Sequence, residues 1–281
     1  MSEPLISAAD AIARHQSGEA IFLDATWRYP GGPKVKVDGF IPKAIAFDID
    51  TVKDITSTLP HMLPLPVAFG RFMDNLGIAN DSELIIYDRM GVFSAPRVWW
   101  MFRAMGHDNV RVLDGGLPAW IEAGGDVAES LPKPKPLAAG QYVATPDPDR
   151  VTNRYGVVTA LDAGSAILID ARTRDRFDGG MPEPRAGMRS GHIPGSTCMP
   201  YTELVTENGL FNREMKVSQV MDIAPDMPVM TTCGSGVTAS LLALALEREG
   251  IKAKVYDGSW AEWGSRTDTP IETKSQRKGG A

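Results

Sequence analysis

Short apolar runs alternate with longer helical stretches along the whole chain. The apolar runs have the length of buried strands and include IFLD, LIIY, ILID and VMTT. Residues 94–106 and 237–250 are helical by length and composition, and each stretch closes on a glycine in the C-cap position. Strands that alternate with helices predict an α/β fold, with a mostly parallel sheet flanked by helices.

The same pattern occurs twice. Four landmarks recur in the same order, displaced by about 145 residues. They are IFLDATWR and ILIDARTR, GFIPKAIAFD and GHIPGSTCMP, LIIYDRMGVFSA and PVMTTCGSGVTA, and VRVLDGGLPAW and AKVYDGSWAEW. The repeat predicts two tandem α/β domains, residues 1–130 and 150–281. The proline-rich segment between them, residues 131–149, has the composition of a linker.

Composition excludes several classes of function. The 281 residues are 43% hydrophobic and carry a net charge of −6, which argues against a nucleic-acid partner. No apolar run is long enough to span a membrane, and the N-terminus does not resemble a signal peptide. The two cysteines form no C-x-x-C pair, so we expect no metal and no cofactor, and a cytoplasmic location where a lone exposed thiol stays reactive.

Cys233 occupies the position where a strand ends and a helix begins, which is where parallel α/β sheets place their active sites. Gly234 and Gly236 leave backbone N–H groups free to point into a concave loop, and the helix from about Val237 directs its positive end there. Both effects favour a thiolate and suit an anionic ligand. Cys198 has no such surroundings and is interpreted as an inert structural thiol.

Two other functions of the Cys233 loop fail on its surroundings. GSGVTA matches a dinucleotide-binding fingerprint, with Asp257 at the spacing of a ribose-binding acid. Too little chain follows for the rest of such a sheet, and the first repeat lacks the fingerprint. A cysteine phosphatase needs an arginine at position 239 to bind phosphoryl oxygens, and Ala239 stands there.

Seven motifs together resemble the two-domain rhodanese-like sulfurtransferases over nearly the whole chain. They are FDID, LPHMLP, SAPRVWWMFRAMG, LDGGLPAW, EPRAGMRSGHIPG, CGSGVT and YDGSWAEWG. In that family the N-terminal domain has lost its active cysteine and the C-terminal domain keeps it. Asp88 at the position equivalent to Cys233 fits this arrangement.

The loop after Cys233 separates two branches of the family. Thiosulfate-using members typically have C-R-K-G-V-T, whereas C-G-S-G-V-T here carries no cation and is similar to the branch that uses 3-mercaptopyruvate. The resemblance implies sulfur transfer from 3-mercaptopyruvate through a Cys233 persulfide, held by the backbone of Gly234, Gly236, Val237 and Thr238, to cyanide or a thiol such as thioredoxin. Pyruvate would be released. The alternatives are a thiosulfate sulfurtransferase and a non-catalytic rhodanese-like binding module.

The family also has a pair of substrate-binding arginines, which correspond to Arg176 and Arg185 in DRFDGGMPEPR. A planar guanidinium can bind a carboxylate through two hydrogen bonds, so two of them suit an α-keto acid. The alternative role for either arginine is an ion pair, for instance with Glu183. Arg172 and Arg189 are interpreted as structural.

A proton relay is implied by the resemblance alone. It maps onto Ser235, His61 and Asp50, and a carboxylate that orients a histidine suits acid–base work near neutral pH. His61 lies in a proline-rich loop suited to reach a site in the other domain. Of the other histidines, His15 and His107 are predicted to lie on the surface, and His192 is predicted to order its turn.

Overall fold

The computed structural model describes residues 3–29 and 32–274. Within it the chain forms two compact units. The first comprises Met1–Thr56, Leu63–Pro148 and Val205–Asn212, and the second comprises Ser57–Met62, Asp149–Leu204 and Arg213–Ala281. Each unit therefore contains a short segment that belongs, by sequence, to the other half of the chain.

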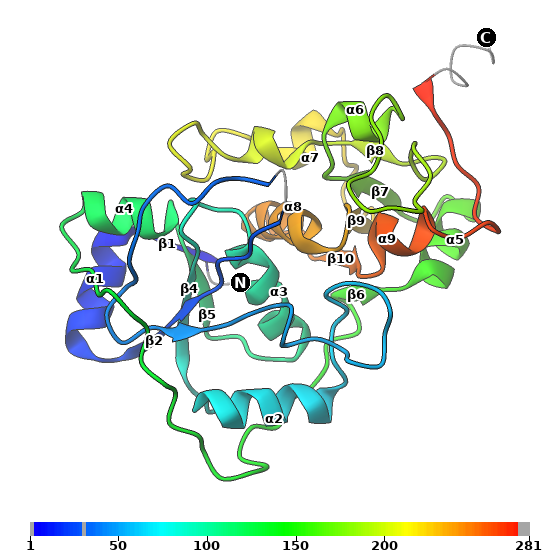
Figure 1. The fold of residues 1–281 in the computed structure, drawn as a ribbon. Helices are drawn as coiled ribbons and strands as arrows, with labels where there is room; N and C mark the ends of the chain where they lie inside the picture. The colour runs from blue at the N-terminus through cyan, green and yellow to red at the C-terminus, as the bar shows by residue number, and fades with distance from the viewer. Residues whose placement is uncertain (1–2, 30–31, 275–281) are drawn as a thin grey trace. The chain divides into compact units, whose positions relative to one another are not determined.

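The first unit contains a parallel sheet whose described strands follow the order β1-β5-β4-β2-β3 (Figure 1). Its strands are β1 (Leu5–Ile6), β2 (Ala20–Asp24), β3 (Ile45–Ala46), β4 (Glu83–Tyr87) and β5 (Val110–Leu113). Its helices are α1 (Ala8–Ser17), α2 (Pro66–Leu76), α3 (Ala95–Ala104) and α4 (Gly116–Glu122).

The second unit repeats this topology, and its described strands follow the order β6-β10-β9-β7-β8, again all parallel. Its strands are β6 (Val151–Thr152), β7 (Ile167–Asp170), β8 (Thr197–Cys198), β9 (Val229–Thr232) and β10 (Ala253–Tyr256). Its helices are α5 (Arg154–Asp162), α6 (Arg174–Phe177), α7 (Val217–Val220), α8 (Val237–Arg248) and α9 (Ser259–Trp263), with a 3₁₀ turn η1 (Tyr201–Leu204).

Equivalent backbone hydrogen bonds join equivalent residues in the two units. The N–H of Leu117 donates to the carbonyl of Asp88 at 3.0 Å, and the N–H of Trp260 donates to the carbonyl of Cys233 at 2.9 Å. Each bond ties the loop after a central strand to the turn after the neighbouring strand. The prediction of two tandem α/β domains is therefore confirmed.

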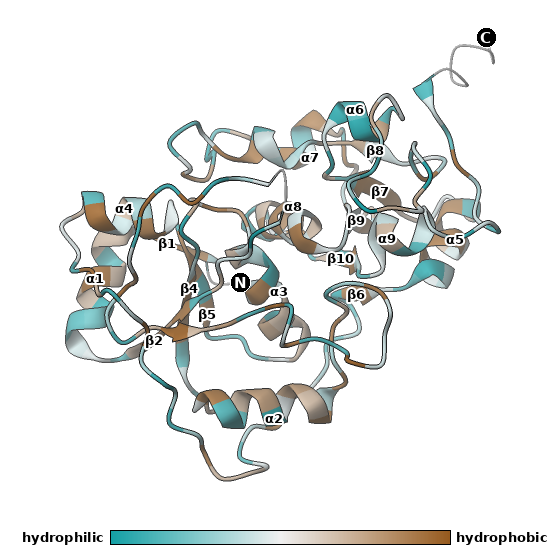
Figure 2. Ribbon diagram, in the orientation of Figure 1, coloured by the Kyte–Doolittle hydropathy of each residue, from teal (hydrophilic) through white to brown (hydrophobic). Residues whose placement is uncertain are grey.

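Burial explains why the central strands read as unbroken apolar runs. In β4, Leu84, Ile85 and Ile86 are all fully buried, because helices cover both faces of a parallel sheet. Figure 2 shows strongly hydrophobic colour on β2 and on α8, while the short helix α6 is hydrophilic. The core of the second unit includes Trp260 and Trp263 packed with residues of α5, β7 and β10.

The segment 131–148 contains no helix or strand, but hydrogen bonds attach it to the first unit. Asp74 on α2 accepts hydrogen bonds from the N–H groups of Gly140, at 2.6 Å, and Tyr142, at 2.8 Å. Thr145 donates its N–H to the carbonyl of Met105 at 2.9 Å. These contacts assign the segment to the first unit.

Two local predictions need correction. The glycines predicted as C-caps, Gly106 and Gly250, lie one residue beyond the caps of α3 and α8 and have φ of 81° and 82°, as a C′ glycine does. His107 is not a surface residue. It is buried, because its Nε2 bonds the carbonyl of Ser82 at 2.9 Å and its Nδ1 lies 3.2 Å from the hydroxyl of Tyr142.

Among the described residues, no helix combines the length and the apolar composition needed to cross a membrane.

Candidate active site

Cys233 directly follows β9, at the carboxyl end of the sheet of the second unit. The sequence led us to expect an exposed thiol, and this expectation is wrong, because only 2% of the residue is accessible. Helix α8 begins four residues later at Val237, with Gly236 as its N-cap at φ 80°. The first N–H groups of a helix have no acceptor within the helix. Helix α8 therefore presents these unbonded N–H donors, together with the positive end of its dipole, to this loop.

The backbone on either side of the cysteine is anchored to the turn that follows β10. The N–H of Cys233 donates to Ser259 Oγ at 3.3 Å, and the hydroxyl of Ser259 donates to the carbonyl of Tyr256 at 2.8 Å. The carbonyls of Cys233 and Gly234 accept from the N–H groups of Trp260 and Ala261, both at 2.9 Å. The cysteine therefore sits on a loop with little freedom to move.

The equivalent loop in the first unit holds an anionic group of its own. Asp88 is fully buried, and its carboxylate accepts four backbone N–H bonds of 2.9 to 3.0 Å, from Met90, Phe93, Ser94 and Ala95. Burial raises the pKa of Asp88, and these four bonds oppose that rise. In this unit, the loop after the central strand thus folds around a carboxylate.

The two loops differ in where the following helix begins. By alignment of the repeats, Val92 corresponds to Val237, but α3 begins only at Ala95. In the first unit the Asp88 side chain accepts hydrogen bonds from the N–H groups of Ser94, just before the helix, and of Ala95, its first residue. In the second unit the helix starts earlier, so its leading N–H groups lie closer along the chain to the cysteine.

The two predicted substrate-binding arginines both reach the Cys233 loop. Arg185 donates from Nη2 to Ser235 Oγ at 3.4 Å. The guanidinium of Arg176 lies against Gly234, where an added Cβ atom would be 3.1 Å from Nη2. The loop of C-G-S-G-V-T lacks a cation of its own, and these two side chains supply positive charge beside it.

Arg176 also makes the ion pair that was considered as its alternative role. Its Nη2 donates to Glu183 Oε2 at 2.5 Å, and its Nε donates to Oε1 at 3.3 Å. The pair is not a surface pair, because the Glu183 side chain is completely buried while 19% of the Arg176 side chain remains accessible. The ion pair and a ligand-binding role are compatible, since a guanidinium has five N–H donors.

The remaining relay residues are described within their own units. Asp50 belongs to the first unit, is exposed, and accepts a hydrogen bond from the indole of Trp27 at 3.0 Å. His61 groups with the second unit, is buried, and adopts a φ of 59°. A positive φ is uncommon outside glycine and marks a constrained turn. The joint action of Ser235, His61 and Asp50 stays a prediction.

The residues assigned structural roles have them. Arg172 bonds Asp170 at 2.7 Å and Glu183 at 2.8 Å, and Arg189 bonds the carbonyl and hydroxyl of Thr269 at 3.0 and 2.6 Å. The ring of His192 stacks on Phe177 at 3.8 Å between centroids and bonds its carbonyl at 2.8 Å, which orders the turn as predicted.

Cys198 is half-buried, and its Sγ lies 3.5 Å from the carbonyl oxygen of Arg172. Burial and the nearby Asp170 carboxylate raise the pKa of this thiol to about 12. Charged groups do surround it, contrary to expectation. Arg172 and Arg174 lower the pKa of the thiol, but burial and Asp170 outweigh them. Cys198 therefore remains a protonated structural thiol near neutral pH.

Sequence reasoning missed three residues that support the site. Glu183 was considered only as an ion-pair partner, while Ser259 and Trp260 were noted only as part of a repeated motif. The motif YDGSWAEWG was the available signal, since it follows the strand beside the cysteine strand. Their roles depend on side-chain contacts that no local pattern encodes.

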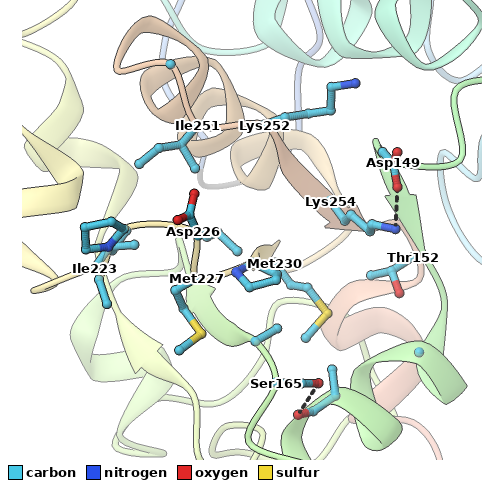
Figure 3. A pocket seen from close by; sticks show the side chains of 18 residues that line it. Asp149, Thr152, Ser165, Ile223, Asp226, Met227, Met230, Ile251, Lys252 and Lys254 are labelled. Atoms are coloured by element: carbon cyan, nitrogen blue, oxygen red, sulfur yellow. Dashed lines mark hydrogen bonds and ion pairs between the residues drawn. The ribbon is translucent and has the colours of Figure 1, made fainter.

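A large cavity of about 1010 Å³ lies in the second unit, at the amino ends of β9 and β10 (Figure 3). Met227, Met230 and Ile251 form part of its apolar lining, and Lys254 pairs with Asp149 across 3.0 Å. None of the predicted site residues lines it. It lies at the opposite end of the strands from Cys233, and parallel sheets carry their chemistry at the carboxyl ends.

Within residues 3–29 and 32–274, no three His, Cys, Asp or Glu side chains cluster so that they could hold a metal ion.

Comparison with known proteins decides the family. A model described as the rhodanese-like domain matches the chain twice, over residues 7–123 and 157–266. The chain belongs to the two-domain rhodanese-like sulfurtransferases. The resemblance inferred from the seven motifs is confirmed, and the sheets that carry Asp88 and Cys233 are the two rhodanese-like domains of this family.

Relatives resemble the chain over nearly its full length. The 3-mercaptopyruvate sulfurtransferase of Escherichia coli K12 is 39% identical, over 97% of this chain and 99% of that protein. The mitochondrial thiosulfate/3-mercaptopyruvate sulfurtransferase 1 of Arabidopsis thaliana is 40% identical, over 97% of this chain and 79% of that protein. The crystal structure of SseA from Escherichia coli, a 3-mercaptopyruvate sulfurtransferase with the rhodanese fold, superposes with a TM-score of 0.78 and 35% identity, covering 92% and 99% of the two chains.

Proposed function

We infer that the protein transfers sulfur from 3-mercaptopyruvate, through a persulfide on Cys233, to a thiol or cyanide acceptor, with release of pyruvate. One observation carries the inference. The buried cysteine stands on an uncharged loop at the start of α8, and two arginines, Arg176 and Arg185, contact that loop from outside. A cysteine nucleophile and a site for a carboxylate therefore lie side by side, as a mercapto acid requires.

The reaction is a double displacement. The Cys233 thiolate forms a bond to the donor sulfur while the carbon–sulfur bond breaks, and the electron pair of that bond stays on carbon as the enolate of pyruvate. The enolate takes up a proton to give pyruvate, and the relay of Ser235, His61 and Asp50 is proposed to move that proton. An acceptor thiolate then attacks the outer sulfur, and Cys233 leaves as a thiolate ready for another cycle.

Binding groups have separate tasks in this scheme. Arg176 and Arg185 hold the carboxylate and keto oxygen of the donor. The backbone N–H groups of the loop, with the N-terminal end of α8, stabilise the charge on the sulfur. The Asp88 loop supports this assignment, because in that related turn of the other domain four backbone N–H groups donate to a buried carboxylate.

Thiosulfate sulfurtransferase is the alternative activity. The Arabidopsis relative is named for both donors, so homology alone does not separate the two activities. The uncharged loop favours the mercapto acid, because a thiosulfate dianion is better matched by cations beside the sulfur. A non-catalytic binding module would need neither the cysteine nor the two arginines around it.

The acceptor of the outer sulfur is proposed to be a thiol. Among proteins, thioredoxin is the acceptor that we propose. A reducing cytoplasm, the location predicted from cysteine usage, supplies such acceptors.

The test measures pyruvate release from 3-mercaptopyruvate in the presence of a thiol, with thiosulfate as a parallel donor. Mass spectrometry after donor alone should find one added sulfur atom on the peptide that contains Cys233. The Cys233→Ser variant should lose both the adduct and turnover, and Cys198→Ser should keep both. Turnover retained in Cys233→Ser would overturn the proposal, as would a sulfur adduct on Cys198 instead.

A further inference from the structure

Glu183 is the buried centre of an ion-pair network next to the Cys233 loop. Its side chain has no accessible surface, and its carboxylate accepts from two arginines. Oε1 accepts from Arg172 Nη1 at 2.8 Å and from Arg176 Nε at 3.3 Å, and Oε2 accepts from Arg176 Nη2 at 2.5 Å. A carboxylate buried this completely is costly unless its partners are well placed.

One of those arginines fixes the position of Glu183. Arg172 is itself fully buried and donates to both oxygens of Asp170, from Nε to Oδ1 at 3.2 Å and from Nη2 to Oδ2 at 2.7 Å, and to the carbonyl of Gly191 at 2.8 Å. Its guanidinium also lies 4.2 Å above the ring centre of Trp260. Arg172 is held on several sides, so its bond to Glu183 gives that carboxylate a rigid anchor.

The other arginine is held by Glu183. Arg176 lies on the four-residue helix α6, and its side chain is long enough to adopt many rotamers in solvent. The Glu183 carboxylate engages its Nε–Nη2 edge through both oxygens, which sets the plane of the guanidinium as well as its position. The group then lies beside Gly234, at the position where a Cβ atom would stand, and Gly234 is the residue after the cysteine.

This arrangement leaves part of Arg176 directed to a ligand. Two of its five N–H donors are engaged by Glu183, while the Nη1 amino group and the second N–H of Nη2 remain for another acceptor. Of the Arg176 side chain, 19% is accessible, so a small molecule can approach it.

We propose that Glu183 is a positioning residue for the donor carboxylate, holding the guanidinium of Arg176 against Gly234 so that it meets a mercapto acid without first having to be ordered. The proposal rests on the sulfurtransferase function inferred above. The effect of Glu183 is specific to the donor, because a donor without a carboxylate does not use the placement of Arg176 in this way. A group fixed before binding saves the ordering cost that a free arginine would pay at each encounter.

The decisive measurement is the steady-state kinetics of Glu183→Gln with two donors. The amide keeps the shape of the side chain and removes the charge that holds Arg176. We expect KM for 3-mercaptopyruvate to rise by about tenfold or more, with kcat changed by less than about threefold. KM for thiosulfate should stay within about twofold of the wild-type value.

Glu203→Gln is the matched control. It removes the carboxylate that pairs with Arg174 on the same helix α6, while leaving the Glu183–Arg176 pair in place. A general loss of stability in Glu183→Gln would affect both donors alike. The proposal requires the donor-specific rise in KM in Glu183→Gln and not in Glu203→Gln.

A double-mutant cycle with Arg176→Gln tests whether Glu183 acts through Arg176. If it does, adding Glu183→Gln to Arg176→Gln should raise KM for 3-mercaptopyruvate no further, because the group to be positioned is already gone. Additive effects would contradict the proposal. Should Glu183→Gln fail to fold, Glu183→Asp enters the same cycle, since it keeps the charge but shortens its reach, and an intermediate KM is expected.

The outcomes separate the two levels of inference. If the wild-type protein releases no pyruvate from 3-mercaptopyruvate, the proposed function itself is wrong. If the wild type is active and the Glu183 variant has an unchanged KM, or loses both donors equally, only the positioning role is overturned.

Discussion

Arg176 lies beside Gly234, and the absence of a long side chain on residue 234 leaves room for its guanidinium. A Cβ atom on Gly234 would stand 3.1 Å from Arg176 Nη2 and 3.8 Å from Nη1. The neutral loop and the loop-facing arginine are therefore two parts of one arrangement. A cation at position 234 would occupy the same space as a guanidinium and repel it.

Gly234→Arg should shift donor preference toward thiosulfate. The new cation displaces Arg176 from the loop and adds charge that suits a dianion. We expect the ratio of kcat/KM for 3-mercaptopyruvate to that for thiosulfate to fall by at least about tenfold. Gly234→Ala is the control, because its methyl adds no charge and asks the Arg176 guanidinium to move by only a few tenths of an ångström. A ratio unchanged in Gly234→Arg would show that loop charge does not select the donor.

Arg185→Gln should impair the mercapto acid far more than thiosulfate. Arg185 contacts Ser235 Oγ, and in the proposed reaction it binds the donor carboxylate through charge-assisted bonds. Losing such a bond costs about 1.5–3 kcal/mol, which corresponds to a decrease of roughly 10- to 100-fold in kcat/KM for 3-mercaptopyruvate. The measurement is the same two-donor comparison, and equal losses on both donors would argue against a carboxylate-binding role.

Cys198 should resist alkylation until the pH is high. Its pKa of about 12 in the folded protein lies above the ordinary value of 9.0, because burial and Asp170 favour the thiol. In the Cys233→Ser variant at pH 8, iodoacetamide should modify native Cys198 about a thousandfold more slowly than the urea-unfolded chain. Mass spectrometry against time measures both rates, and similar rates in the two states would contradict the raised pKa.

The same shift has a defined effect on stability. Because the folded state holds the thiol proton more tightly, the contribution of Cys198 is complete below about pH 9 and is lost as the pH rises toward about 12. Urea denaturation across that window would detect the loss, and a Cys198→Ser variant should lack this component of the pH dependence.

Asp88→Asn should destabilise the protein. One oxygen of Asp88 accepts the N–H groups of Phe93, Ser94 and Ala95, and the other accepts that of Met90. An asparagine has one acceptor oxygen, so at least one buried N–H would face an amide N–H₂. We expect a loss of about 1–3 kcal/mol in the free energy of unfolding, measured by urea denaturation.

The exposed Asp81 of the same unit offers the comparison for this prediction. Asp81→Asn should change the free energy of unfolding by no more than about 0.5 kcal/mol. If Asp88→Asn changes the free energy of unfolding by equally little, the carboxylate is not what orders its loop.

Much of the fold could be predicted because it is encoded locally. The apolar runs of β4 and β9 are buried on both faces, so they appear in the sequence without alternation. The repeat also predicted that Asp88 and Cys233 stand at equivalent positions. What failed were predictions about exposure. His107 and Cys233 lie in polar or glycine-rich surroundings in the sequence, yet both are buried by residues distant along the chain.

The sequence by itself determined the two α/β domains, the position of Cys233 at a strand end and the family of the protein. These features follow from the period of hydrophobic residues and from short motifs, which neighbouring residues specify. Only the tertiary structure decided that Glu183 is buried between Arg172 and Arg176, and that Ser259 and Trp260 anchor the backbone of Cys233. The physical reason is that the partner of a charged or polar side chain is chosen by three-dimensional packing and desolvation, which bring together groups that the chain keeps apart.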